Sequence, residues 1–291
     1  MREGILAAVD LSSSSRSVIQ SARVLAERLG WPVTVLHVVE DSYLRGAPRR
    51  FAAVWDERYR APLEEAGRVL EELARRALAV LAPEGTETLV HHGNPVREVA
   101  GEALTKRLVV LASEGRSPLE RVARGGVAHY LLHRGEVPVL LVDEKRPLEG
   151  LSRVAAAVDD SSAGLSAWKY AQALAEATGA EAIAFHLVSL LPGSCCIPTY
   201  LPPELMKEAE VVTHARQALV ERLGVPEDRL VIERGEESTG LLDLAREHGV
   251  DLLVVGSRAK SSQRTRLGRT VVELMYQAEM PLLVVPEATP L

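Results

Sequence analysis

Residues 7–39 read AAVDLSSSSRSVIQSARVLAERLGWPVTVLHVV, and residues 156–188 read AAVDDSSAGLSAWKYAQALAEATGAEAIAFHLV. The two stretches align without a gap at a shift of 149 positions, and 14 of the 33 aligned pairs are identical. Chance does not supply an ungapped match of this kind, so the chain is a tandem duplication. We place the first domain at residues 1–145 and the second at residues 151–291, joined by the charged, proline-containing stretch 143–150.

The alternation of strand and helix patterns inside each repeat predicts the fold class. In the first repeat a short apolar run at residues 5–9 is followed by apolar residues at helical spacing, and Gly30 ends that helix. The β-rich run at residues 33–39 is continuous enough for a strand that is buried on both faces. Such alternation favours a parallel sheet with right-handed crossovers. We therefore expect an α/β protein with two tandem doubly wound five-stranded parallel sheets, each with helices on both faces.

The remaining elements are expected from the same patterns. A long helix in the first repeat runs from about residue 62 to 81 and carries Leu63, Ala66, Leu70, Leu73, Ala77 and Leu81 on one side. The other expected elements of this repeat are strands at 86–91, 108–112 and 139–142 and helices at 95–105 and 126–134. In the second repeat the strands are expected at 154–158, 182–188, 230–233, 252–255 and 282–285.

Composition argues against a nucleic-acid-binding, membrane or secreted protein. The net charge is −6, so no overall attraction to nucleic acid or anionic lipid is expected. The longest apolar runs are five or six residues, against the roughly 20 that a membrane-spanning helix needs. Met1 precedes charged residues rather than the apolar stretch of a secretory signal, and the two cysteines, Cys195 and Cys196, are adjacent and unsuited to a disulfide framework. We expect a cytoplasmic protein that binds neither membrane nor nucleic acid.

An aspartate follows the first strand of each repeat, at Asp10 and Asp159. Ligands of open parallel sheets bind there, beyond the carboxyl ends of the strands. The carboxylate can accept hydrogen bonds from a sugar hydroxyl or a base amine, or it can cap the turn into the next helix, and both readings stay open. The serines at 12–15 and 161–162 are expected to be helix caps and turn formers rather than nucleophiles.

A glycine loop follows the fourth strand of each repeat. Glycines that leave backbone amides exposed beside a helix N-terminus form an anion site suited to phosphate. The candidate residues are Ala112, Gly115, Gly125 and Gly126 in the first repeat and Gly256, Ala259, Gly268, Arg269 and Thr270 in the second.

The second glycine loop is also basic. Its cations are Arg258, Lys260, Arg264, Arg266 and Arg269, with no acidic residue among them. In a protein of negative net charge, such a run is either a solvated loop or a counter-charge for phosphate groups. The sequence leaves both interpretations open.

The histidines are expected to be structural, and we assign no catalytic residue and no metal ligand. His37 and His186 lie on strands that are predicted to be buried. His91 and His92 are neighbours in a strand and point to opposite faces of the sheet, which argues against joint chelation of a metal.

Both repeats resemble the universal stress protein family, over nearly the whole chain. Three features coincide in each half: an aspartate after the first strand, a histidine near the end of the second, and a proline before the last strand, thirteen residues after a glycine. They lie at Asp10, His37 and Pro138 in the first half and at Asp159, His186 and Pro281 in the second. The resemblance implies a Rossmann-like fold of the adenine nucleotide alpha hydrolase type.

The resemblance also implies a phosphate loop in each repeat, and both loops depart from the family pattern. ATP-binding members carry glycine, two residues, glycine, nine residues, glycine, and then serine or threonine. The first repeat keeps this spacing but has Ala112 for the first glycine and Gly126 for the hydroxyl residue. The second is one residue shorter, with Ala259 for the second glycine and Arg269 for the hydroxyl residue. Thr270 is a candidate for the missing hydroxyl, and Arg269 for an ion pair with phosphate.

Carried over by position, Asp10 and Val38 would hold the nucleoside in the first repeat, and Asp159 and Leu187 in the second. The expected ligand is ATP, with AMP or ADP as alternatives and Mg²⁺ as a companion ion. The resemblance further implies that the repeats pair through their last strands, 139–142 beside 282–285, as an intramolecular pseudo-dimer. A homodimer of the whole chain is a further alternative, and no protein partner is indicated.

Three functions remain open. The leading hypothesis is a non-enzymatic stress-response protein that binds an adenine nucleotide in at least one repeat. The second is a slow nucleotide hydrolase. Asp10 and Asp159 are the only candidates for its base or metal ligand at the proper strand ends, and the chain has no Walker lysine loop. The third is a nucleotide-free scaffold whose two sites are degenerate.

Overall fold

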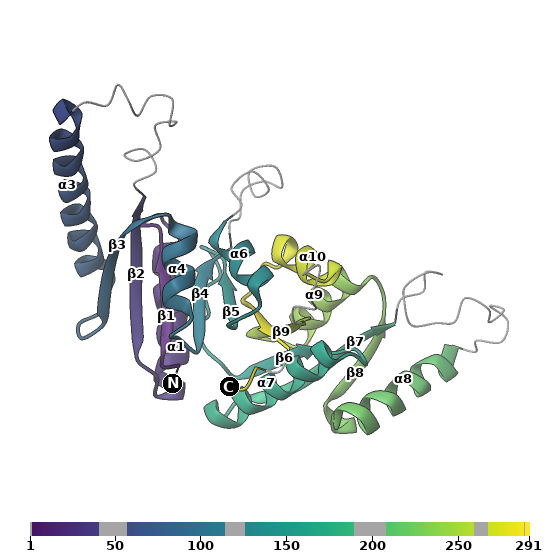
Figure 1. The fold of residues 1–291 in the computed structure, drawn as a ribbon. Helices are drawn as coiled ribbons and strands as arrows, with labels where there is room; N and C mark the ends of the chain where they lie inside the picture. Colours follow the sequence, from purple (N-terminus) through teal and green to yellow (C-terminus); the bar gives the residue numbers. More distant parts are fainter. Residues whose placement is uncertain (1, 41–56, 114–125, 189–207, 259–266, 288) are drawn as a thin grey trace. The chain divides into compact units, whose positions relative to one another are not determined.

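The computed structural model describes residues 2–40, 57–113, 126–188, 208–258, 267–287 and 289–291 (Figure 1). It divides into two compact units. One consists of Met1–Leu131 and Val139–Pro147, and the other of Leu132–Pro138 and Leu148–Leu291. The boundaries predicted for the two domains stay a prediction.

The first repeat is a parallel sheet whose strands alternate with helices. Its strands are β1 (Ile5–Val9), β2 (Val33–Glu40), β3 (Glu87–Gly93), β4 (Leu108–Ala112) and β5 (Val139–Val142), and its helices are α1 (Ser15–Leu29), α3 (Glu57–Leu81), α4 (Pro95–Ala103) and α6 (Val127–Arg134). The strand order is β3-β2-β1-β4-β5, and all neighbours are parallel. The order therefore reverses between β1 and β4, where ligands bind in sheets of this kind.

The second repeat has the same topology. Its strands are β6 (Arg153–Ala157), β7 (Glu181–Val188), β8 (Leu230–Arg234), β9 (Leu252–Ser257) and β10 (Leu282–Pro286), and its helices are α7 (Ser162–Thr178), α8 (Glu208–Leu223), α9 (Glu237–Glu247) and α10 (Arg269–Gln277), with the short 3-10 helix η2 (Glu227–Arg229) before β8. The order is β8-β7-β6-β9-β10, again parallel throughout. Two tandem five-stranded parallel sheets confirm the predicted fold class.

Most predicted boundaries lie within two residues of the observed ones, and β1, β4 and β5 have the predicted bounds. The start of α3 differs, because this helix begins at Glu57 rather than near residue 62. The added first turn is charged and has no apolar periodicity, so the sequence pattern could not indicate it.

The apolar stripe predicted for α3 is not the face that packs on the sheet. Ala74 and Leu78 are buried, whereas Leu70 and Leu73 are 46% and 55% exposed. Apolar residues surround more than half of this helix, so its periodicity fits more than one face, and these two leucines lie outside the face that packs. Small Ala74 lets the helix approach β2 and β3, which it contacts.

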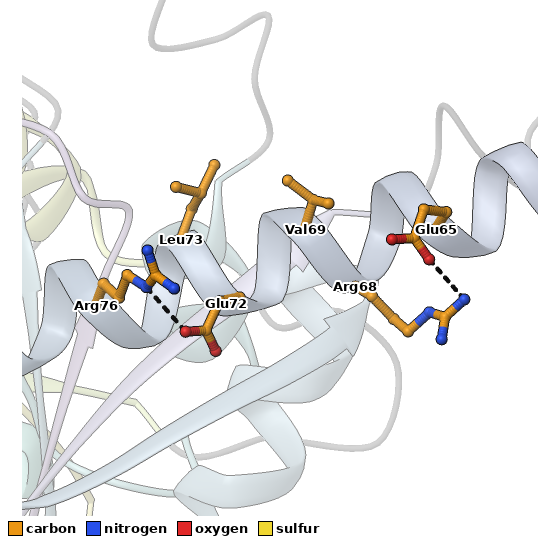
Figure 2. A pocket seen from close by; sticks show the side chains of 6 residues that line it. All are labelled: Glu65, Arg68, Val69, Glu72, Leu73 and Arg76. Carbon is orange, nitrogen blue, oxygen red and sulfur yellow. Dashed lines mark hydrogen bonds and ion pairs between the residues drawn. The ribbon is translucent and has the colours of Figure 1, made fainter.

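The outer side of α3 carries ion pairs beside exposed apolar side chains. Figure 2 shows Val69 and Leu73 in a shallow hollow of this helix, with Glu65 paired to Arg68 at 2.6 Å and Glu72 paired to Arg76 at 2.8 Å. Such exposed pairs contribute little to stability, about 0.3–0.5 kcal/mol each. None of the predicted site residues lines this hollow.

Glu71 joins α3 to the edge strand β3. Its Oε2 lies 2.9 Å from Nε2 of His92, and its Oε1 accepts a hydrogen bond of 3.1 Å from Nε of Arg75. The hydrogen bond from Arg75, and after it the one from His92, lower the pKa of the Glu71 carboxyl. His91 instead has its Nδ1 3.3 Å from Oε2 of Glu98 in α4. The two histidines thus contact different helices, as the alternation along a strand predicts.

Glycine determines how closely α7 approaches the second sheet. A Cβ added to Gly256 in β9 would overlap the carbonyl oxygen of Ala163, and one added to Gly164 would overlap Asp159. In the first repeat the aligned positions are Ser15 and Ala112, which have side chains. There α1 begins two aligned residues later than α7 does. The first repeat therefore has a longer turn between its first strand and first helix.

The close packing of α7 on β9 predicts the effect of a methyl group at Gly256. We expect Gly256→Ala to lower the free energy of unfolding of the second repeat by about 1–3 kcal/mol, because the methyl group has no room. Urea unfolding of the nucleotide-free protein measures this change. Gly235→Ala is the matched control, since its methyl group meets nothing within 4 Å. Equal stability of the two variants would contradict the packing described.

The contacts of Glu71 predict a pH dependence of stability. The pKa of Glu71 is lower in the folded protein than its ordinary value of 4.5. The ionised carboxylate therefore contributes stability above about pH 4.5, and this contribution is lost as the pH falls through the lowered pKa. We expect Glu71→Gln to show a shallower loss of unfolding free energy than wild type between about pH 5 and pH 3. His92→Ala should change the profile only partly, because Arg75 is the larger cause; superimposable profiles would exclude this role of Glu71.

Candidate functional site

The carboxyl ends of three strands meet at one edge of the first sheet. β1 lies between β2 and β4, and Val9 at its end is opposite His37 of β2. Asp10 follows β1, Val38 is the residue after His37, and Ala112 ends β4. Val38 is buried, Ala112 is half-buried and Asp10 is exposed. The structure thus brings three of the predicted site residues to the switch point of the sheet.

One oxygen of Asp10 shapes the turn after β1. Its Oδ1 accepts a 2.9 Å hydrogen bond from the amide of Ser12, and the hydroxyl of Ser15 lies at 3.4 Å. No partner among the described residues reaches Oδ2. Both readings of this residue are therefore compatible with the geometry, because the carboxylate can hold the turn with one oxygen and accept a hydrogen bond from a ligand with the other.

Asp159 has the same place in the second repeat but a different turn. Its Oδ1 accepts hydrogen bonds from the amide of Ser161 at 3.2 Å and from the hydroxyl of Ser161 at 2.5 Å. The Ser161 hydroxyl in turn caps α7 by accepting from the amide of Gly164 at 3.1 Å. The predicted serine cap is thereby confirmed in the second repeat, whereas Ser14 precedes α1 without a capping bond from its side chain.

Two histidines fasten the strand ends that carry the aspartates. Nδ1 of His37 lies 2.9 Å from the carbonyl oxygen of Val9, and Nδ1 of His186 lies 2.8 Å from that of Val158. A carbonyl oxygen only accepts, so Nδ1 is protonated in both rings. This confirms the structural reading of the histidines and adds a function, which is to fix the residue before each aspartate. The presence of a histidine at the aligned position of both repeats was the sequence feature that could have indicated this role.

The glycine loops lie partly outside the described residues. The predicted residues Gly115, Gly125 and Ala259 fall there, as do Lys260, Arg264 and Arg266 of the basic run. Gly126 immediately precedes α6, and Gly268 is the N-cap of α10. Both are at helix N-termini, where free amides and the helix dipole favour an anion.

Residues at the ends of the fourth strands already have structural roles. The amide of Ser113 donates to the carbonyl of Val142 at 2.7 Å, so the group that follows Ala112 is not available to a ligand. Gly256, which the sequence assigned to phosphate, accommodates the first turn of α7. The sequence pattern could not separate this packing role from a ligand role, because both require a glycine.

Arg269 and Thr270 both contact carboxylates. The hydroxyl of Thr270 donates to Oε2 of Glu237 at 2.5 Å, and Nε of Arg269 donates to Oε1 of Glu273 at 2.6 Å. The Glu273 hydrogen bond raises the pKa of Arg269, and the same bond lowers the pKa of Glu273, which also accepts from Ser238. Sequence reasoning missed Glu237 because it lies 33 positions from Thr270. The spacing of four residues between Arg269 and Glu273 on one helix was a signal that could have found that ion pair.

Leu187, the predicted nucleoside contact of the second repeat, lies against α9. A Cβ added to Gly240 would fall 2.7 Å from its Cδ1, so the helix and this side chain are in close contact. Leu187 is half-buried, whereas its counterpart Val38 is buried. The two predicted nucleoside contacts therefore have different surroundings.

Within the described ranges, no three histidine, cysteine, aspartate or glutamate side chains are grouped so that they could hold a metal ion. None of the helices in the same part of the chain combines the length and apolar character that crossing a membrane requires.

The chain is similar to known proteins over nearly its full length. Among solved structures it resembles a universal stress protein from Archaeoglobus fulgidus DSM 4304, at 21% identity and a TM-score of 0.63, with 98% of this chain and 96% of that chain covered. It also resembles a functionally unknown protein from Pseudomonas aeruginosa PAO1, at 17% identity and a TM-score of 0.62, with 98% and 93% covered. No curated protein matches the chain by sequence.

Identity this low shows the fold alone, and the family assignment rests on a match in sequence. The sequence model of the universal stress protein family matches the chain twice, over residues 1–143 and over residues 150–286. The matches coincide with the two repeats that the sequence itself displays. The chain therefore belongs to the universal stress protein family, as a member with two tandem copies.

Proposed function

We propose that the protein is a non-enzymatic stress-response protein that binds ATP or another adenine nucleotide at the carboxyl edge of at least one repeat. The observation that carries the proposal is the open Oδ2 of Asp10 at the switch point of the first sheet. An acceptor at this point suits the hydroxyls of a ribose. Val38 beside it supplies apolar contact for the nucleoside, as the family resemblance implies.

The phosphate end is proposed to lie at the N-terminus of α6. Gly126 precedes this helix, and its amide together with the helix dipole would offset part of the phosphate charge. A Mg²⁺ ion would be held mainly by phosphate oxygens and water, which agrees with the lack of a metal-ligand cluster among the described residues. The same site accommodates AMP or ADP with fewer phosphate contacts.

We assign no catalytic step to this edge. The open Oδ2 of Asp10 is assigned to a ribose hydroxyl, and Nδ1 of His37 is used by Val9. A hydrolase would need a base or a metal that positions water. The cytoplasmic location expected from the sequence is part of this proposal.

The first prediction of the proposed function concerns Asp10. We expect calorimetric titration of ATP with Mg²⁺ into nucleotide-stripped protein to give one or two sites per chain. Asp10→Asn should weaken the site of the first repeat about tenfold or more, because the amide nitrogen would replace the open acceptor with a donor while Oδ1 keeps the bond to Ser12.

Asp251→Asn is the matched control for this variant. Asp251 directly precedes β9, at the amino edge of the second sheet, and its Oδ2 accepts from the amides of Ser152 at 2.6 Å and Arg153 at 2.9 Å. Its substitution should leave the affinity unchanged. Absence of heat at several temperatures, together with no nucleotide released on denaturation, would rule out the proposal in favour of a scaffold.

The proposed pairing of the two repeats through their last strands has a separate test. In a Cys195→Ser, Cys196→Ser background, one cysteine is placed within residues 139–142 and one within residues 282–285. Mild oxidation should give an intramolecular disulfide for at least one such combination, detected by mass spectrometry, since a disulfide forms only at short Cα separation. A cysteine at Glu87 on edge strand β3 serves as the control and should not crosslink. Failure of every combination would exclude this pairing.

A further inference from the structure

The two repeats differ in the charge at their helix N-termini. In the second repeat α9 begins with Glu237 and is preceded by Glu236, which makes no capping bond with its side chain. In the first repeat the corresponding helix, α4, is capped by the neutral side chain of Asn94, which accepts from the amide of Arg97 at 3.2 Å, and the acidic residue of its first turn, Glu98, lies 3.3 Å from His91. Negative charge at a helix N-terminus is stabilising, and in the second repeat the protein supplies it from its own side chains.

The acidic residues of α9 contact the first turn of α10. Glu237 accepts the hydrogen bond of 2.5 Å from the hydroxyl of Thr270. Glu273 in α10 accepts from Ser238 of α9, and also from Arg269 at 2.6 Å. Two groups of the second loop that could contact phosphate, the Thr270 hydroxyl and the Arg269 guanidinium, are therefore paired with carboxylates.

A phosphate at this place would meet an unfavourable field. The Thr270 hydroxyl has one hydrogen to donate, and Glu237 accepts it. A phosphate chain at the N-terminus of α10 would also lie close to carboxylates that stabilise the Arg269 charge, those of Glu273, Glu236 and Glu237. Like charges at short range oppose binding, and at this exposed place the effect falls as the salt concentration rises.

We propose that Glu237 is a specificity residue that excludes nucleoside triphosphates from the second repeat, so that the chain binds ATP in the first repeat alone. This inference rests on the proposed function and assigns it to one of the two sites. It also gives a meaning to the departures from the family pattern in the second loop, where Arg269 stands in place of a hydroxyl residue. The change goes together with carboxylates that neutralise the arginine.

A purely structural role for the same contacts makes a different prediction. The bonds from Thr270 and Ser238 also fasten α9 to α10. If that were all, replacing Glu237 would change the stability of the second repeat and leave its affinity for ATP unchanged.

The experiment counts ATP sites in the full chain by calorimetry with Mg²⁺. The wild type should bind one ATP, and Asp10→Asn, which weakens the first site about tenfold or more, should leave it only partly occupied over the same concentration range. Addition of Glu237→Gln to Asp10→Asn should restore one site, with affinity at least about tenfold above that of Asp10→Asn, equivalent to about 1.4 kcal/mol. Thr270→Ala in this background should remove the gain, because a neutral amide competes less than a carboxylate for the Thr270 hydroxyl, and that hydroxyl would then be missing.

Glu247→Gln is the matched control, since it makes the same change of charge at the last residue of α9. Added to Asp10→Asn, it should not restore an ATP site. Two ATP sites in the wild type would overturn the inference and leave the proposed function intact. One site in the wild type with no gain from Glu237→Gln would also overturn it, by showing that another feature excludes ATP. No site in any variant would instead reject the proposed function itself.

Discussion

Parallel pairing of every strand is the constraint on which each repeat depends. Because neighbouring strands run in the same direction, their carboxyl ends lie on one edge, and a helix must return the chain between them. In the order β3-β2-β1-β4-β5 the crossovers diverge between β1 and β4. Asp10 follows the first of these strands and Ala112 ends the second. The position of the candidate site thus follows from the strand order, and the side chains around it decide which ligand would fit.

The two repeats have kept this winding and changed its details in compensating ways. Where the second repeat has Gly164 and Gly256, α7 lies close enough to the sheet that no Cβ fits. Where the first has Ser15 and Ala112, the helix starts later, and Leu11 takes a left-handed φ of 61° in the intervening turn. A left-handed backbone is costly for a residue with a side chain. That it occurs directly after Asp10 indicates that this turn is held by its surroundings, with the carboxylate among its hydrogen-bond acceptors.

The sequence allowed the fold to be predicted almost completely and the site only in part. Buried parallel strands such as β4 and β5 are continuous apolar runs with clear ends, and their bounds could be read directly. The packing face of α3 could not, since apolar residues cover more than half of that helix and the side that packs is the one with Ala74 and Leu78. The contact of Thr270 with Glu237 could not be predicted from the sequence for another reason. It joins two helices that are distant in sequence, and no periodicity or motif encodes such a pair.

A helix N-terminus at the edge of such a sheet attracts negative charge, and that charge can come from a ligand or from the protein. In the second repeat Glu237 provides it and engages Thr270, so the polar groups are satisfied without a bound phosphate. In the first repeat Asn94 caps α4 with a neutral oxygen, and Oδ2 of Asp10 has no partner among the described residues. A duplicated chain can afford this divergence, because one copy can retain the ligand site while the other replaces the ligand's charge with its own and remains folded. The same fold thus has an open carboxylate oxygen at Asp10 in the first repeat and a carboxylate paired with Thr270 at Glu237 in the second. The difference between the repeats lies in a few side chains near the helix N-termini.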